Sequence, residues 1–235
     1  MAAGLVLVER SERWASVAAD QIANLLITRV EAAGLCTLAL AGGTTPQPVY
    51  QHLSRPPLAR RIPWPAIEVF FGDERAVPGD HPDSNFRMAH ETLLNRVPVR
   101  QERVHRMEAD RTDLDAAARD YARLLPDVVD VLILGMGTDG HTASLFPCHP
   151  ALRERRRVVS VAGGHPFGPR LTITAPVILG ATEVVVLVTG EDKAEVLARV
   201  LEGPDDTHRL PAQLARGRRW IVDRSAAACL EDPPR

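Results

Sequence analysis

Short apolar runs alternate along this chain with stretches in which apolar residues recur at helical spacing. Short apolar runs bounded by polar or small residues are typical of buried strands, whereas recurrence at i, i+3 and i+4 is typical of amphipathic helices. The pattern predicts strands over residues 5–8, 35–41, 67–71, 131–134, 158–161, 171–174, 184–188 and 220–222. It predicts helices over residues 14–30, 46–53, 84–94, 113–125 and 194–201.

Strand, loop and helix repeated in this order predict a mostly parallel sheet with helices on both faces, because a parallel strand pair needs a crossover that is usually helical. No internal repeat, low-complexity tract or linker interrupts the alternation, so we expect a single domain over residues 1–235. The least regular segment runs from Arg153 to Pro169. It is the candidate for a mobile flap.

The composition narrows the class of partner. The chain has 235 residues, of which 45% are apolar and 25% charged, and its formal net charge is −2. This balance is typical of a globular protein and predicts neither a nucleic-acid nor a membrane partner. No apolar run approaches the roughly 20 residues of a membrane helix, and the N-terminus lacks the basic region of a signal peptide. Cys36, Cys148 and Cys229 lie far apart, so we expect reduced thiols in a cytoplasmic protein.

Four loops that follow predicted strands carry small or charged residues. They are Gly42–Thr45, Asp73–Arg75, Gly135–His141 and Gly190–Lys193. Because the carboxyl ends of parallel strands share one edge of a sheet, we expect these loops to line one cleft. Lys193 is the only lysine among the 28 basic residues, which is consistent with a position that needs a compact ammonium.

The first of these loops has the features of a phosphate site. Gly42, Gly43, Thr44 and Thr45 offer backbone N–H groups, two hydroxyls and the positive end of the following helix, for which Thr45 is the expected cap. A plain strand-to-helix turn is the alternative interpretation. The segment is neither a P-loop nor a Gly-x-Gly-x-x-Gly fingerprint, so we expect no nucleotide cofactor.

The second loop places three charges directly after a strand. Asp73 and Arg75 alternate along the chain and are expected to face the cleft. Glu74, which lies between them, is expected to form a salt bridge with a neighbour.

The segment Ser84–Arg87 follows this loop after a stretch rich in proline and glycine. Ser84 or Asp83 can cap the predicted helix. For Asn85 and Arg87 two interpretations stay open, namely ordinary positions at a capped helix start or contacts to a substrate.

His141 carries the chemistry of the third loop. It lies two residues after Asp139 in a glycine-rich turn, and we expect a short helical segment to follow. A neutral imidazole can take a proton from water while a nearby carboxylate fixes its tautomer. Ser144 is the alternative nucleophile, but the chain has no Gly-x-Ser-x-Gly elbow, and a serine on that helix would point beyond His141. We therefore expect attack by water. Metal-ligand spacings are absent beside the turn, so no metal is expected.

Several segments together resemble the 6-phosphogluconolactonase family: GMGTDGHTASLFP, FFGDERAVPGDHPDSNFR, LALAGGTTP, PRLTIT and GEDK. The resemblance implies the three-layer, Rossmann-like α/β/α fold that this family shares with glucosamine-6-phosphate deaminases, ribose-5-phosphate isomerases and CoA transferases. It also implies hydrolysis of 6-phospho-D-glucono-1,5-lactone to 6-phosphogluconate in the oxidative pentose phosphate pathway, without a cofactor.

The resemblance further implies roles for single residues. His141 matches the general base and Asp139 the carboxylate beside it, while Asp73 is a further catalytic candidate whose division of labour with Asp139 stays open. The positions expected to hold the phosphate or the developing oxyanion are matched by Arg75, Arg170, Lys193, Gly43, Thr44 and Thr45.

Two other functions are alternatives to lactone hydrolysis, namely deaminase-like isomerisation and non-catalytic sensing of a sugar phosphate. The related deaminases carry a glutamate five residues after the histidine for ring opening, and here that position is Phe146, which cannot shuttle protons. A non-catalytic sugar-phosphate sensor would keep the phosphate loop but not need His141. The expected partner is thus a small phosphosugar lactone, bound by a monomer or weak homo-oligomer.

Overall fold

A six-stranded parallel sheet forms the centre of the molecule, whose computed structural model describes residues 4–8, 10–162 and 168–231. The strand order is β1-β9-β8-β5-β2-β3, and every neighbouring pair is parallel. The strands span Leu5–Val8 (β1), Cys36–Leu40 (β2), Ile67–Phe71 (β3), Val131–Gly135 (β5), Glu183–Val188 (β8) and Arg219–Asp223 (β9). The predicted α/β class and its mostly parallel sheet are thereby confirmed.

A second, three-stranded sheet stands apart from the first. It has the order β4-β7-β6 with antiparallel pairing, over Asp73–Arg75 (β4), Arg170–Ile173 (β7) and Val158–Val161 (β6). Asp73–Arg75 was expected as a loop, but these three residues form β4 because β7 lies beside them. β7 pairs antiparallel with β4 on one side and with β6 on the other, so these three strands form a sheet of their own.

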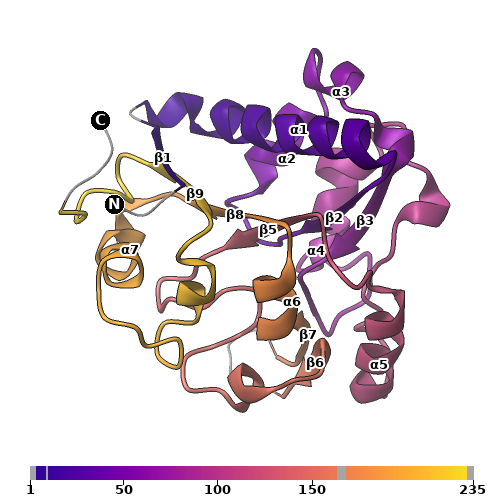
Figure 1. The fold of residues 1–235 in the computed structure, drawn as a ribbon. Helices are drawn as coiled ribbons and strands as arrows, with labels where there is room; N and C mark the ends of the chain where they lie inside the picture. Colours follow the sequence, from indigo (N-terminus) through magenta and orange to yellow (C-terminus); the bar gives the residue numbers. More distant parts are fainter. Residues whose placement is uncertain (1–3, 9, 163–167, 232–235) are drawn as a thin grey trace.

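Helices cover both faces of the parallel sheet (Figure 1). On one face lies α1 (Trp14–Ala33), with α2 (Gln47–Leu53) packed against it and the short α3 (Leu58–Arg61) nearby. On the other lie α6 (Ala175–Gly180), α7 (Ala194–Leu201) and the small sheet, with α5 (Leu114–Leu124) against its strands β6 and β7. The remaining helix, α4 (Asn85–Ala89), continues as a π-helical turn over His90–Leu94.

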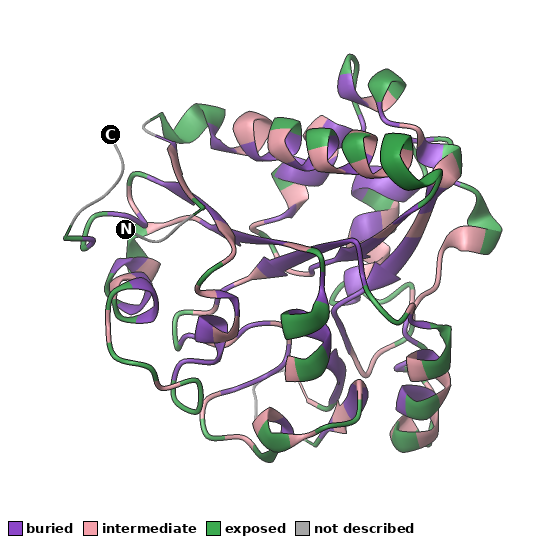
Figure 2. Cartoon of the chain, in the orientation of Figure 1, coloured by how far each residue is buried: buried purple, intermediate pink, exposed green. Residues whose placement is uncertain are grey.

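The central strands are apolar throughout because both of their faces are covered. Residues of β5 and β8 are almost all buried, and purple dominates the middle of the sheet in Figure 2. Strands buried on both faces read as continuous runs of Val, Ile and Leu, which is why the sequence pattern located them well. Among the described residues no helix is long and apolar enough to cross a membrane.

The two tyrosines of the chain form hydrogen bonds to the backbone at the carboxyl-terminal ends of two strands. Tyr50 Oη accepts a hydrogen bond from the Ala41 N–H and donates to the Ala41 carbonyl, both at 2.9 Å. Tyr121 Oη accepts from the Phe71 N–H at 2.7 Å and contacts the Phe71 carbonyl at 3.3 Å. Burial raises the pKa of both phenols, so they stay protonated. Each tyrosine therefore anchors the last residue before a functional loop.

Two local predictions differ from the structure. No helix follows His141; residues 142–145 form a tight turn in which the Leu145 N–H donates to the Thr142 carbonyl at 3.0 Å. The candidate flap from Arg153 to Pro169 contains β6, so part of it is sheet, and residues 163–167 lie outside the described residues.

Candidate active site

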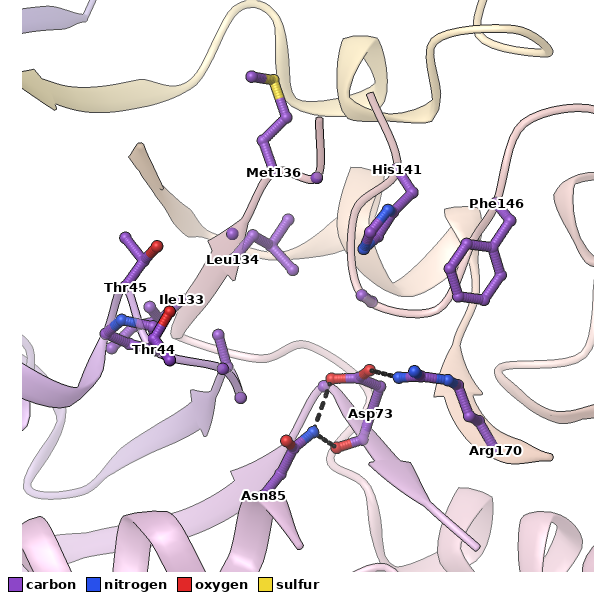
Figure 3. A pocket seen from close by; sticks show the side chains of 18 of the residues that line it. Thr44, Thr45, Asp73, Asn85, Ile133, Leu134, Met136, His141, Phe146 and Arg170 are labelled. Atoms are coloured by element: carbon purple, nitrogen blue, oxygen red, sulfur yellow. Dashed lines mark hydrogen bonds and ion pairs between the residues drawn. The ribbon is translucent and has the colours of Figure 1, made fainter. Parts of the chain in front are cut away.

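A cavity of about 430 Å³ opens at the carboxyl-terminal edge of the parallel sheet (Figure 3). The loops after β2, β3, β5 and β8 all contribute to its wall, as their placement in a parallel sheet predicts. The structure brings together in this wall every residue proposed for the site from the sequence: Gly42, Gly43, Thr44, Thr45, Asp73, Arg75, Asn85, Asp139, His141, Arg170 and Lys193.

His141 and Asp139 form a hydrogen-bonded pair in the loop after β5. Nδ1 of His141 lies 2.6 Å from Oδ1 of Asp139, and the same oxygen accepts the His141 backbone N–H at 3.0 Å. The His141 side chain is 33% exposed, so its ring reaches the cavity and still packs beside Phe146, with ring centroids 4.9 Å apart.

The charge state of Asp139 assigns the tautomer of His141. Partial burial raises the pKa of Asp139, but the hydrogen bonds and charge of His141 outweigh burial and the net direction is down. The carboxylate is therefore ionised near neutral pH and can only accept hydrogen bonds. Nδ1 of His141 must then carry the proton, which leaves Nε2 with a lone pair toward the cavity.

Gly137 makes room for this pair. A methyl group at residue 137 would overlap the imidazole of His141 and stand 2.7 Å from Asp139 Oδ1. Gly140 serves the same turn differently, because its φ of +83° lies in the left-handed region that favours glycine. The glycines of this loop are thus needed for close approach at residue 137 and for backbone conformation at residue 140.

Asp73 lies at the floor of the cavity with its carboxylate already engaged. Oδ2 accepts the Ser144 hydroxyl at 2.6 Å, and Oδ1 accepts Asn85 Nδ2 at 3.2 Å. Arg170 Nη1 stands 3.8 Å from Oδ2 (Figure 3). A buried carboxylate held by three partners is suited to orienting them.

Glu74 does not form the salt bridge expected from the sequence; none of the ion pairs between described residues includes it. Its buried carboxylate instead accepts the N–H groups of Arg75, Asn85 and Phe86 and the hydroxyl of Ser84, at 2.7–3.0 Å. Burial raises its pKa, and these hydrogen bonds oppose the rise. Glu74 therefore fastens the start of α4 to β4.

Replacing Glu74 with glutamine is expected to lower the free energy of unfolding by about 2 kcal/mol, because an amide NH₂ would face backbone donors that lose their acceptor. Urea denaturation of the two proteins measures the difference. The matched control is Glu91→Gln, whose exposed pairing with Arg87 at 2.8 Å predicts a loss of about 0–1 kcal/mol. Equal stability of Glu74→Gln and wild type would contradict the role of Glu74.

The residues of Ser84–Arg87 differ in where the structure places them. Ser84 caps α4, since its hydroxyl accepts the Arg87 N–H at 3.1 Å. Asn85 lines the cavity, whereas Arg87 is directed to Glu91 and the Asp80 carbonyl and does not line it. Asn85 also packs so closely on Gly42 that a methyl group there would overlap its amide.

Three cations line the cavity from three different elements. Arg170 on β7 is buried over the Phe146 ring, with Cζ 5.6 Å from the ring centroid. Arg75 on β4 is half-buried and donates to the Asp83 carbonyl at 2.6 Å. Burial lowers the pKa of Lys193, although the carboxylates of Asp192 and Asp223 oppose this shift. The cavity thus favours an anionic ligand.

The glycine-threonine loop lies on the side of the cavity where Figure 3 labels Thr44 and Thr45. Gly43 has a φ of +88°, a conformation that favours glycine. The predicted cap is wrong: α2 begins at Gln47, Pro46 is the flanking residue, and no side chain caps it. Since α2 has only seven residues, the backbone N–H groups and hydroxyls of this loop contribute more to an anion site than its dipole.

Ser144 is no nucleophile in this arrangement. It is fully buried and absent from the cavity wall, and its hydroxyl donates to Asp73 instead of to an imidazole. The cavity wall also includes Ile133 and Leu134 of β5, which the sequence did not place in the site. Among the described residues, no group of three or more His, Cys, Asp or Glu side chains could hold a metal ion.

The parallel sheet, the cavity at its carboxyl-terminal edge and the histidine–carboxylate pair define an α/β protein with an enzyme-like site for a small anionic ligand. A sequence model of the family described as "Glucosamine-6-phosphate isomerases/6-phosphogluconolactonase" matches residues 9–222. The chain belongs to this family, which confirms the resemblance found in the sequence motifs.

Individual relatives agree with this membership. A 6-phosphogluconolactonase of Nostoc sp. is 36% identical over 222 residues, covering 89% of this chain and 90% of its own length. A 6-phosphogluconolactonase of Rattus norvegicus is 41% identical over 177 residues, covering 69% of this chain and 68% of its own.

Solved structures show the same fold. The crystal structure of 6-phosphogluconolactonase from Thermotoga maritima has a TM-score of 0.83 at 30% identity, covering 94% of this chain and all of that one. A monomeric glucosamine-6-phosphate deaminase has a TM-score of 0.85 at 22% identity, covering 96% of this chain and 99% of that one. This second likeness concerns the fold alone.

Proposed function

We propose that this protein hydrolyses 6-phospho-D-glucono-1,5-lactone to 6-phosphogluconate in the oxidative pentose phosphate pathway. The observation that carries the proposal is the 2.6 Å contact between His141 Nδ1 and Asp139, which leaves Nε2 as a base in a cavity lined by three cations. Curated relatives named 6-phosphogluconolactonase, at 36% and 41% identity, support the substrate.

In the proposed reaction His141 acts as a general base. Nε2 takes a proton from water while the water oxygen forms a bond to the lactone carbonyl carbon. Asp139 accepts the Nδ1–H bond throughout and stabilises the imidazolium that forms. When the ring C–O bond breaks, the imidazolium returns the proton to the departing ring oxygen, so the enzyme ends in its starting state.

In this scheme the cations of the cavity stabilise two different negative charges, the tetrahedral oxyanion and the phosphate of the substrate. Arg170 contacts the same Phe146 ring as His141 does, which supports a role for its guanidinium in stabilising the tetrahedral oxyanion. Lys193, Arg75 and the Gly43–Thr45 loop would hold the remote phosphate. Binding energy from that phosphate orients the carbonyl for attack.

Phe146 favours lactone hydrolysis over deamination or isomerisation of a sugar phosphate. Its ring contacts both His141 and Arg170, so a phenyl group lies beside the base where ring opening would need a proton-transferring side chain. Hydrolysis needs one base and a charge clamp, and both are present.

An assay on freshly generated 6-phosphogluconolactone, corrected for spontaneous hydrolysis, tests the proposed function. We expect the purified protein to accelerate loss of the lactone and to leave glucosamine 6-phosphate unchanged. A rate no faster than the buffer blank would overturn the proposal, and binding without turnover would indicate a sugar-phosphate sensor.

Lys193→Ala is expected to reduce kcat/KM for the phosphorylated lactone by about 10-fold or more and to leave the unphosphorylated lactone nearly unaffected. The ammonium gives the phosphate a charged donor, and its lowered pKa means that this charge is lost at a lower pH than for a free lysine. The measurement is the ratio of kcat/KM values for the two lactones. An unchanged ratio would contradict the phosphate role.

We also propose that one domain over residues 1–235 carries the activity, in the cytoplasm, as a monomer or weak homo-oligomer. The free thiols of Cys36, Cys148 and Cys229 support a reducing compartment. Cell fractionation and light scattering of the purified protein test the location and the oligomeric state.

A further inference from the structure

We propose that Ser144 is a positioning residue for the reaction, an inference that rests on the proposed lactone hydrolysis. Ser144 lies three residues after His141, in the turn that closes the loop from β5. Its hydroxyl connects that loop to Asp73 and Arg170 of the second sheet, and so sets the base and the oxyanion cation at a fixed separation.

The contacts of Ser144 reach two elements of the second sheet. Its Oγ donates to Asp73 Oδ2 at 2.6 Å, and its backbone N–H donates to Thr172 Oγ1 on β7 at 3.0 Å. Arg170 Nη1 donates to Oγ at 3.5 Å and stands 3.8 Å from Asp73 Oδ2. One fully buried hydroxyl therefore hydrogen-bonds to both a carboxylate and a guanidinium.

The backbone of the turn that contains Ser144 adopts a strained conformation. Ala143, directly before Ser144, has a φ of +49°, in the left-handed region that residues with a Cβ rarely adopt. Such a conformation is unfavourable and persists where surrounding contacts hold it. Here the two hydrogen bonds of Ser144 hold it, and the Thr142 hydroxyl adds a bond to the Gly135 carbonyl at 2.8 Å.

The base and the cation otherwise belong to separate sheets. His141 follows β5 of the parallel sheet and Arg170 lies on β7 of the antiparallel sheet, and these two sheets share no strand. Both side chains contact the Phe146 ring, but an apolar ring contact has little directional preference. The hydrogen bonds of the Ser144 hydroxyl are directional, and they hold the Arg170 guanidinium in one orientation. Without them, Arg170 would move toward Asp73 and away from the carbonyl.

The test compares wild type with Ser144→Ala in the lactonase assay. We expect kcat to fall about 10-fold or more, with KM within about threefold of wild type because the phosphate contacts are intact. The matched control is Ser160→Ala, since Ser160 Oγ also donates to a carboxylate, Asp115, at 2.6 Å, but lies outside the cavity wall. A kcat for Ser144→Ala within about twofold of wild type would overturn the proposal.

A double-mutant cycle separates positioning from general stability. If Ser144 acts through Asp73, Ser144→Ala lowers kcat little further in an Asp73→Asn background, and fully additive effects would overturn the proposal. Should Ser144→Ala not fold, Ser144→Cys retains the side-chain volume but donates weakly, and a wild-type kcat for it would overturn the proposal equally. Absence of hydrolysis by wild type would instead count against the proposed function.

Discussion

We expect His141→Ala to lower kcat for lactone hydrolysis by at least about 100-fold, the lower range for loss of a general base. The variant would remove the Nε2 lone pair that we propose takes the proton from water, while the three cations of the cavity stay in place. Affinity for 6-phosphogluconate is therefore expected to change little. Initial rates corrected for spontaneous hydrolysis, together with product inhibition constants, measure the two effects separately.

Two variants sharpen this result. His52→Ala removes a histidine of α2 that does not line the cavity, and its kcat should equal that of wild type. Asp139→Asn keeps the side-chain shape but can donate to Nδ1, which would move the proton to Nε2 and remove the base, so its kcat should fall as well. A His141→Ala enzyme as fast as wild type would exclude His141 as the base.

Gly137→Ala is expected to lower kcat about 100-fold with the fold retained. The added methyl group would overlap the His141 ring, and a displacement of about 1 Å in a catalytic group can cost this much. The residue does not have a left-handed φ, so alanine is tolerated by the backbone, and the side chains of the pair have to move. Kinetics and thermal unfolding on the same preparation measure rate and stability.

The matched control for Gly137→Ala is Gly180→Ala at the end of α6. A methyl group there meets no atom within 4 Å, and its φ is not left-handed. We expect wild-type kcat for this control. A wild-type kcat for Gly137→Ala would show that the pair does not need its present geometry, whereas loss of folding in both variants would point to a general effect of replacing glycine.

Much of the site was predictable because its residues lie in local patterns. Asp139 and His141 share one glycine-rich loop, and the loops after β2, β5 and β8 meet because parallel strands end at the same edge. The motifs indicated the family for the same reason, since they are short continuous segments. The cavity wall contains all of the proposed residues, while their roles stay predictions for the variants above.

The errors of prediction share a cause as well. β4 is a three-residue strand of charged side chains, Asp73–Arg75, and it forms only because β7 lies beside it. Glu74 was expected in a salt bridge, but the fold presents backbone N–H groups of α4 to its carboxylate. Thr45 was expected to cap α2, but the helix begins later. In each case a partner distant in the sequence, or a shift of a residue or two, decided the outcome.

The sequence by itself determined the α/β class, the parallel strands and the histidine–carboxylate loop, because apolar periodicity and glycine placement act over a few residues. Only the tertiary structure decided that Asp73 and Ser144 contact each other, since these residues lie 71 positions apart and meet where β4 of the second sheet lies beside the loop after β5. It also decided that Tyr50 and Tyr121 hold the strand ends beneath the site. Hydrogen bonds between distant segments depend on the geometry of the whole chain, so local sequence patterns do not predict them.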